Sequence, residues 1–269
     1  MTICAALAAI VAVGGHVRAD YDTPKWIQMP DLTPWGMDVK VSEFRGLADD
    51  FLCTMTGPVT DIHIWGSWRD DVVADPGRIT FMFAIFDDIP ADHPDNSYGF
   101  SVPNVDEERW GGEFRGADGE FTARLYHDNA PQGWYDPDTY EPDNHQQVWQ
   151  YNFFIDPEDA FIQEGTPQNP IVYWLGLKVV IDPPQGPGGD VPEEFGWKTS
   201  VVHWNDDAVV GYLEDGEVWL IEELLFPYEH PYLGESADLA FVITPEPATL
   251  AFVALGAAGL VLRRGRGRV

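Results

Sequence analysis

Paired aspartates recur along the sequence, and carboxylate oxygens are the ligands that calcium prefers in proteins. None of the pairs has the spacing of an EF-hand loop, so they predict only weak calcium sites, and a solvated acidic surface is the alternative. Because neighbouring side chains of a strand point to opposite faces, we expect at most one aspartate of each pair to aim inward. The candidate calcium ligands are Asp49, Asp50, Asp87, Asp88, Asp206 and Asp207.

Carbohydrate binding is a second candidate chemistry, because sugar rings stack on exposed aromatic side chains. Trp134, Tyr135 and Tyr140 lie in a polar stretch and are the candidates for this role. Most other tryptophans lie in apolar, strand-like runs, where we expect them to pack in the core. The three residues predict a carbohydrate site only if their rings reach the surface.

Catalytic motifs are sparse in this sequence. The histidines show neither HxH nor HExxH spacing, and Cys53 is the single cysteine after residue 19, which excludes a cysteine zinc site there. The stretch 234–238 lacks the last glycine of a nucleophile elbow. Acids are so numerous that pairs at the separation of a glycosidase arise by chance. We therefore expect a protein without catalytic activity, with a polysaccharide-active enzyme as the alternative.

The elements that must position these side chains are predicted to be strands. Short runs of β-branched and aromatic residues alternate with Gly, Pro, Asp and Asn, and helical periodicity is nearly absent. This pattern predicts an all-β protein, an antiparallel β-sandwich of jelly-roll type. The predicted strands cover residues 61–68, 78–89, 121–126, 148–155, 171–181, 198–203, 217–221 and 237–244.

The segments between these strands are predicted to be acidic loops, with one short helix. The clearest loops are residues 87–97, 129–144 and 183–194. A helix is predicted over residues 157–163, because Asp156 can cap it and a proline suits the first helical position.

Composition and charge exclude several classes of function. The chain has 269 residues, of which 45% are hydrophobic, enough for a packed core. It has 45 acids against 15 Lys and Arg, a formal net charge of −30. Nucleic acid and anionic lipid would be repelled by such a chain, so neither is expected as a partner. All of the acids lie between residues 20 and 246, so both ends differ sharply from the body.

The first 19 residues predict a secretory signal peptide. Residues 3–13 are an apolar run of the length of a signal core, and Val17 and Ala19 provide small residues before a cleavage point at Asp20. No Lys or Arg precedes the run, so the usual positive start is missing. A buried N-terminal helix is the alternative.

The last 26 residues contain a three-part pattern. Pro245, Glu246 and Pro247 precede an apolar run over residues 248–262, which would form a helix only about 22 Å long, short of a bilayer core of about 30 Å. An arginine-rich end follows, beginning with Arg263 and Arg264. This order resembles the PEP-CTERM sorting tail of Gram-negative bacteria. The resemblance implies an exosortase-type sorting protease as partner, transient membrane anchoring through residues 248–262, and removal of the tail. The alternative is an ordinary C-terminal anchor helix.

The body itself resembles an uncharacterised domain of planctomycete surface proteins. The resemblance covers roughly residues 24–243 and implies a fold and a cellular address, but no activity. Its blocks are Phe195-Gly196-Trp197-Lys198-Thr199-Ser200, His203-Trp204-Asn205-Asp206-Asp207-Ala208 and Asp238-Leu239-Ala240-Phe241-Val242. In addition, Ala48-Asp49-Asp50-Phe51 followed by the stretch 60–68, with its Trp65-Gly66, is similar to a motif of exported bacterial β-sandwich proteins that bear PEP-CTERM tails.

These observations predict three parts: a signal peptide at residues 1–19, an acidic β-sandwich at 20–243 and a sorting tail at 244–269. The expected function is that of an exported, non-catalytic surface or extracellular-matrix protein. A C-terminal helix would anchor it in the membrane until processing, after which it would reach the cell surface or the medium. A carbohydrate-binding module is the alternative, with extracellular polysaccharide as partner. Calcium is the one candidate cofactor.

Overall fold

The computed structural model describes residues 24–129, 131–137, 139–183 and 193–244. These residues form strands joined by turns, so the predicted all-β class is confirmed. Two large sheets and one small sheet account for the described strands. Three single-turn 3-10 helices lie at Arg69–Asp71, Pro76–Arg78 and Gly116–Asp118.

One large sheet has nine strands within the described residues. All of its pairs are antiparallel except β2 with β9, which are parallel. Its main path is β1, β17, β5, β14, β2, β9 and β10, while β11 pairs with both β5 and β8. The strands are β1 (Trp26–Gln28), β2 (Met37–Val41), β5 (Asp61–Trp68), β8 (Phe121–His127), β9 (Gln132–Asp136), β10 (Thr139–His145), β11 (Val148–Phe154), β14 (Phe195–Lys198) and β17 (Phe241–Thr244).

The other large sheet has six described strands, in the order β16, β15, β3, β13, β6 and β7, all antiparallel. A small sheet pairs β12 (Phe161–Gln163) with β4 (Gly57–Val59). The strands of the six-stranded sheet are β3 (Arg45–Cys53), β6 (Ile79–Ile89), β7 (Val102–Arg115), β13 (Ile171–Ile181), β15 (Val209–Glu214) and β16 (Glu217–Glu223).

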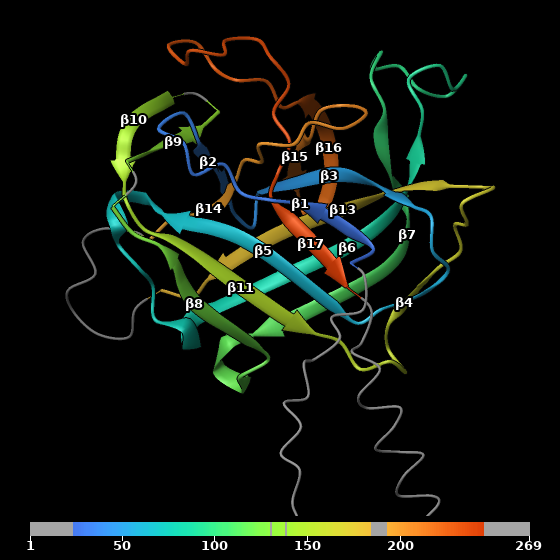
Figure 1. Cartoon of the computed structure of the whole chain (residues 1–269), viewed down its shortest axis with the longest axis horizontal. Coiled ribbons are helices and arrows are strands. Elements are labelled where there is room, and N and C mark those ends of the chain that lie inside the picture. Colours follow the sequence, from blue (N-terminus) through green and yellow to red (C-terminus); the bar gives the residue numbers. More distant parts are fainter. Residues whose placement is uncertain (1–23, 130, 138, 184–192, 245–269) are drawn as a thin grey trace, which may run out of the picture. The chain divides into compact units, whose positions relative to one another are not determined.

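The main core lies between the two large sheets, which overlap in the view of Figure 1. Phe81 of β6 contacts Phe153 of β11 and Phe195 of β14, with ring centroids 5.1 and 5.3 Å apart. Aromatic pairs of this geometry add to the stabilisation from apolar burial. Because side chains alternate between the two faces of a strand, every second residue points to this core. Ile62 and Ile64 of β5 are an example.

The six-stranded sheet also buries residues on its outer face, which points away from the nine-stranded sheet. A second apolar cluster there includes Ala48, Trp174, Val209 and Ile221. It is covered in part by the start of β7, because Val102 belongs to the same cluster. Side chains of both faces of this sheet are therefore withdrawn from solvent around β3 and β13.

The long apolar runs predict the strands well. The ranges predicted for β5 and β13 match the observed bounds, and β6, β8, β11 and β16 differ by one or two residues at an end. The strand predicted over 198–203 is misplaced, because β14 ends at Lys198 and Val201 and Val202 are exposed. The strand β17 begins four residues later than predicted.

Two predictions between strands are wrong. The expected helix over 157–163 is a single turn followed by β12, because Phe161 pairs with Val59 and is buried. Asp156 does cap that turn, accepting a hydrogen bond from the Glu158 amide at 3.0 Å. The expected loop over 129–144 instead contains β9 and all but the last residue of β10, and these two strands form a hairpin. Jelly-roll topology stays a prediction, and the predicted C-terminal helix lies outside the described residues.

Candidate functional site

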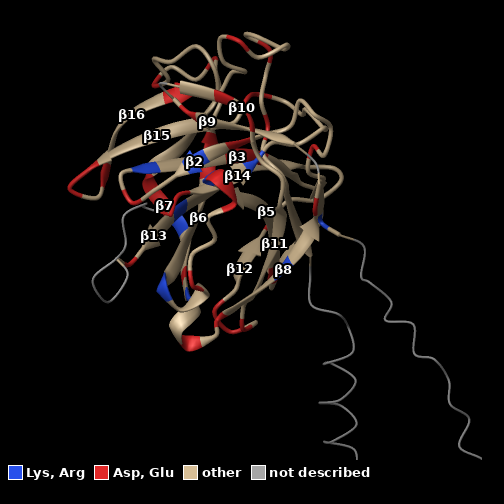
Figure 2. Ribbon diagram, turned by 90° about the vertical axis from the view of Figure 1, so that its left-hand side faces the viewer, with Lys and Arg blue, Asp and Glu red and all other residues tan. Residues whose placement is uncertain are grey.

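Seven carboxyl side chains gather around β3, where the six-stranded sheet meets the loop before β15 and the segment before β17. Figure 2 shows acidic residues over much of the body and basic residues at few places, so acids alone do not mark a site. These seven stand out because they lie close together and all of them are buried or half-buried. This group is called the acidic cluster below, and it consists of Asp49, Asp50, Asp88, Asp206, Asp207, Glu223 and Asp238.

The strands β3 and β6 place the outer members of the acidic cluster. Leu47 and Phe51 of β3 face the main core, so Asp50 points to the outer face with Ala48. In the sheet, Asp50 is paired with Trp174 of β13. The Trp174 ring donates its Nε1–H to Asp88 of β6 at 2.8 Å, so this indole lies between the two strands that carry Asp50 and Asp88.

The loop over residues 203–207 covers Asp50 from the solvent side. Asn205 adopts a left-handed backbone conformation, with φ of 60°. Its side-chain amide donates hydrogen bonds to Asp50 and, at 3.3 Å, to Asp206. The Ser101 hydroxyl donates to Asp206 at 2.6 Å from the segment just before β7. Asp50 thus accepts its side-chain hydrogen bond from a neutral amide, and it is only 1% exposed.

The inner members of the acidic cluster join the two large sheets. Asp49 accepts hydrogen bonds from the Gln28 side chain at 3.0 Å and from the Leu239 amide at 2.7 Å. Asp238 accepts one from the Trp204 amide at 2.7 Å. Both carboxyls are completely buried. As expected for neighbours in a strand, Asp49 aims toward the main core and Asp50 toward the outer face, and both are buried because β3 is covered on both faces there.

Two oxygens in the acidic cluster are buried without any hydrogen-bond partner. They are Oδ1 of Asp50 and Oδ1 of Asp238. A buried ionised oxygen in this position carries a cost of desolvation that nothing offsets. Protonation, or a cation brought in from solution, would remove that cost.

Burial, with help from neighbouring charges, shifts the pKa values of the cluster upward. Burial raises the pKa of Asp50 to about 8, with further contributions from Asp238, Asp88 and Asp206 and an opposing one from Asn205. Burial raises the pKa of Asp238 to about 7. The pKa of Asp49 lies well above its ordinary value, because burial and the Asp238 and Asp50 charges all oppose its ionisation. The acidic cluster thus holds protons near neutral pH.

Asp207 and Glu223 form a carboxyl pair at the edge of the acidic cluster. Burial raises the pKa of Asp207 to about 7, and its hydrogen bond to Glu223 and the charge of Glu223 raise it further. Burial also raises the pKa of Asp88, an effect that its hydrogen bond from Trp174 opposes. A hydrogen bond between two carboxyls requires a proton on one of them. One of these two side chains is therefore protonated whenever this hydrogen bond is present.

The structure brings together five of the six predicted calcium ligands. Asp87 is the exception: its side chain lies 3.4 Å from the Arg109 guanidinium, at the surface. Among the described residues, no group of three or more His, Cys, Asp or Glu side chains is arranged to hold a metal ion. Calcium binding at the remaining five therefore stays a prediction.

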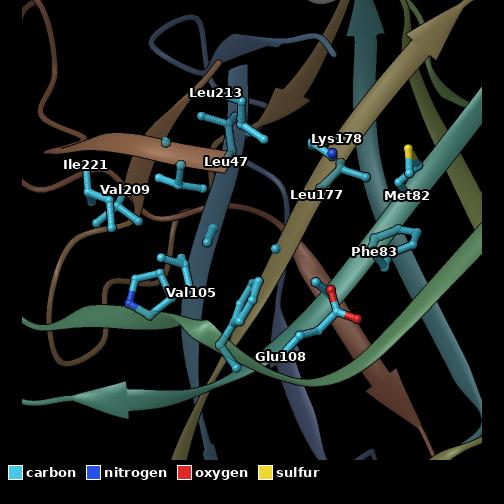
Figure 3. Close-up of a pocket in the computed structure, with 18 of the residues that line it drawn as sticks. Leu47, Met82, Phe83, Val105, Glu108, Leu177, Lys178, Val209, Leu213 and Ile221 are labelled. Carbon is cyan, nitrogen blue, oxygen red and sulfur yellow. The ribbon is translucent and has the colours of Figure 1, made fainter. Parts of the chain in front are cut away.

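A groove lies beside the acidic cluster on the same outer face. Its volume is about 520 Å³, and Ala48 and Val209, one alternation along their strands from Asp50 and Asp207, line it. Small residues form its floor, where Gly176 of β13 pairs with Ala48 of β3 and Ala84 of β6. Figure 3 shows Val209 and Ile221 on one side and Lys178 and Met82 on the other.

The predicted carbohydrate residues do not form an exposed platform. Trp134 is completely buried in β9, so its ring is not available for stacking on a sugar. Tyr135 and Tyr140 are partly buried and pack against the main core. Tyr140 contacts the His230 ring, with centroids 5.3 Å apart.

Sequence reasoning missed a second buried charged group, the triad of Asp38, His145 and Lys198. Asp38 lies 2.9 Å from His145 Nε2 and 3.1 Å from Lys198 Nζ, and all three side chains are completely buried. Burial alone would raise the pKa of Asp38, but the two neighbours outweigh it and lower that pKa. A lysine inside the apolar block 195–200 was the available signal for a buried pair.

Sequence reasoning also missed Asp238, Glu223, Asn205 and Ser101 as neighbours of the predicted ligands. Asp238 and Asn205 belong to blocks that carried the family resemblance, so their place in the sequence was noted but their chemistry was not.

The described part of the chain contains no helix long and apolar enough to cross a membrane.

Comparison with known proteins gives two matches. Residues 244–266 match the PEP-CTERM protein-sorting motif, which confirms the resemblance of the tail. No curated protein and no solved structure matches the chain. Residues 24–244 match the model described as Domain of unknown function (DUF7901), and this stretch carries the acidic cluster, the groove and the buried triad. The chain therefore belongs to the DUF7901 family, with a PEP-CTERM sorting motif following its domain.

Proposed function

We propose that this protein is an exported, non-catalytic component of the cell surface or extracellular matrix. The observation that carries the proposal is the PEP-CTERM motif over residues 244–266, which begins at the last residue of β17. This motif implies exosortase-dependent export. In the proposed route, residues 1–19 direct secretion, residues 248–262 hold the chain at the membrane, and an exosortase-type protease removes the tail.

The chemistry of the acidic cluster supports a structural role for it. Asp49 and Asp238 are completely buried and accept backbone hydrogen bonds, so they tie segments of the two sheets together. A general acid or nucleophile must instead reach its substrate. The cluster acts in this proposal as a buried joint between the two sheets and the loop over 203–207.

The proposal is tested by changing the sorting motif in the producing organism. Glu246→Ala removes the charged residue between the two prolines and should leave a larger product in the membrane fraction. Glu229→Ala, at an exposed position of the body, is the matched control and should be processed normally. Mass spectrometry of the C-terminal peptide in each cell fraction measures the outcome. Normal removal of the tail from Glu246→Ala protein would contradict the proposed role of the motif.

A further inference from the structure

We propose that the groove on the outer face of the six-stranded sheet binds a small amphiphile: an aliphatic chain that carries one carboxylate. This inference goes beyond the proposed function, because export and sorting do not require any ligand. It rests on three features of the groove, namely a lysine with no partner in the described part of the chain, a rim that carries acids, and an apolar floor made of small residues.

Lys178 is the exception among the cations of the body. Of the ten Lys and Arg residues that the structure describes, the other nine have a hydrogen-bond or ion-pair partner, and Lys178 has none. It is half-buried in β13, and its stem packs beside Gly46 of β3. In a body so rich in acids, an unpaired ammonium inside a groove is positioned for an anion that comes from outside the chain.

The rim of the groove limits that anion to a single charge. Asp106, Glu108 and Glu217 line the groove together with Lys178, and no acid among the described residues lies within ion-pair distance of the lysine. Figure 3 shows Glu108 on β7, apart from Lys178 on β13. A ligand with many negative charges, such as an acidic polysaccharide, would be repelled by these acids and by the body as a whole. One carboxylate can pair with the lysine while the rest of the ligand stays uncharged.

The remaining lining of the groove suits an aliphatic chain. Ala48, Ala84 and Gly176 form a low floor across three paired strands, and Val209 and Ile221 form an apolar side. Phe86 also lines the groove, but it packs over Gly176, where an added Cβ would lie 3.0 Å from its ring. A volume of about 520 Å³ is within the range of small-molecule sites. Burial of methylene groups on this floor would supply most of the affinity.

The probe in this test is octanoate. The protein is the exported form, purified from the producing organism. Isothermal titration calorimetry at pH 7 should show saturable binding of octanoate. Octan-1-ol, which has the same chain without the charge, should bind about tenfold more weakly. Galacturonate, which has the carboxylate without an aliphatic chain, should not bind. Saturable binding of galacturonate in place of octanoate would overturn the proposal in favour of a sugar ligand.

Two variants locate the site. Lys178→Met keeps the aliphatic stem but removes the charge, and it should weaken octanoate binding about tenfold while leaving octan-1-ol unchanged. Ala84→Leu fills the floor and should abolish binding of both probes. Arg115→Met, an exposed charge loss on β7 outside the groove, is the matched control and should bind as the wild type does. Thermal melting confirms that each variant is folded.

Two results would overturn the proposal. One is the absence of octanoate binding to the wild-type protein up to millimolar concentration. The other is equal octanoate affinity in Lys178→Met and wild-type protein, which would place any binding outside the groove.

Discussion

At the scale of single residues, the unusual feature is a carboxyl that is buried without a cation. Asp50 is covered by Asn205 and paired in the sheet with Trp174, and one of its oxygens has no partner. Asp38 is buried to the same degree but faces Lys198 and His145, and its pKa moves the other way. The two aspartates show that burial alone does not decide ionisation, and that the charge of the neighbours does.

The Asp50→Asn variant tests the protonation of this carboxyl. Since the pKa of Asp50 is raised to about 8 in the folded state and is ordinary when unfolded, wild-type stability should fall as pH rises from about 4 to 8. The amide does not ionise, so the variant should gain stability over wild type across this range. We expect an advantage of about 1–3 kcal/mol above pH 8, measured by urea unfolding.

Asp87→Asn is the matched control for that experiment. Asp87 lies at the surface beside Arg109 and outside the acidic cluster, so its amide variant should follow the wild-type pH profile. An Asp50→Asn protein whose stability runs parallel to wild type from pH 4 to 9 would contradict the assigned pKa.

The sequence predicted many members of this site but not their state. Paired aspartates marked Asp49, Asp50, Asp206 and Asp207, because adjacent acids stand out in any sequence. Asp238 was missed as a member, since it is a single acid inside the stretch predicted as a strand over 237–244. Burial of the cluster depends on the loop over 203–207 folding onto β3, a contact between residues more than 150 positions apart. No local pattern encodes such a contact.

At the scale of elements, buried strands were predicted better than exposed ones. The apolar runs of β5 and β13 are continuous, and their bounds follow from the sequence. Most residues of β7 are exposed or half-buried acids, glycines and arginines, so its 14 residues lack an apolar period. The β9–β10 hairpin was hidden in an acidic stretch, although Trp134 at its centre is completely buried. Pairing with β2 made this stretch a strand.

The loop over 203–207 should loosen as the acidic cluster ionises. Burial raises the pKa of Asp238 and of Asp207 to about 7, so repulsion beneath the loop grows between pH 6 and 9. Hydrogen exchange at the amides of this loop should lose about tenfold in protection over that range, after correction for the intrinsic rate. The amide of Gly133, bonded to the Gly36 carbonyl far along the chain, is the control and should keep its protection. Constant protection in both segments would contradict ionisation beneath the loop.

At the scale of the whole molecule, negative charge is the dominant feature. Residues 20–246 contain all 45 acids of the chain. Mutual repulsion of these charges destabilises the compact state, and salt reduces that repulsion. The stabilisation that any salt gives by screening must be distinguished from the stabilisation that calcium gives at a specific site.

Melting temperatures measured in NaCl and in CaCl2 at equal ionic strength distinguish the two effects. We expect the melting temperature at pH 8 to rise by a few degrees as NaCl increases, because screening weakens repulsion. A calcium site at the acidic cluster predicts a further rise with CaCl2, which a chelator reverses and Asp50→Asn reduces. Equal melting temperatures in the two salts would contradict the predicted calcium site and leave protons as the neutralising species.

The position of β17 has a consequence for what sorting leaves behind. This strand lies between β1 and β5, and its last residue, Thr244, donates a hydrogen bond to Asp61 at 3.1 Å. Thr244 is also the first residue of the sorting motif. Proteolysis within the motif would therefore leave a carboxyl terminus that follows directly on a strand hydrogen-bonded on both sides. The backbone of such a strand is protected from exopeptidases, which favours a long lifetime outside the cell.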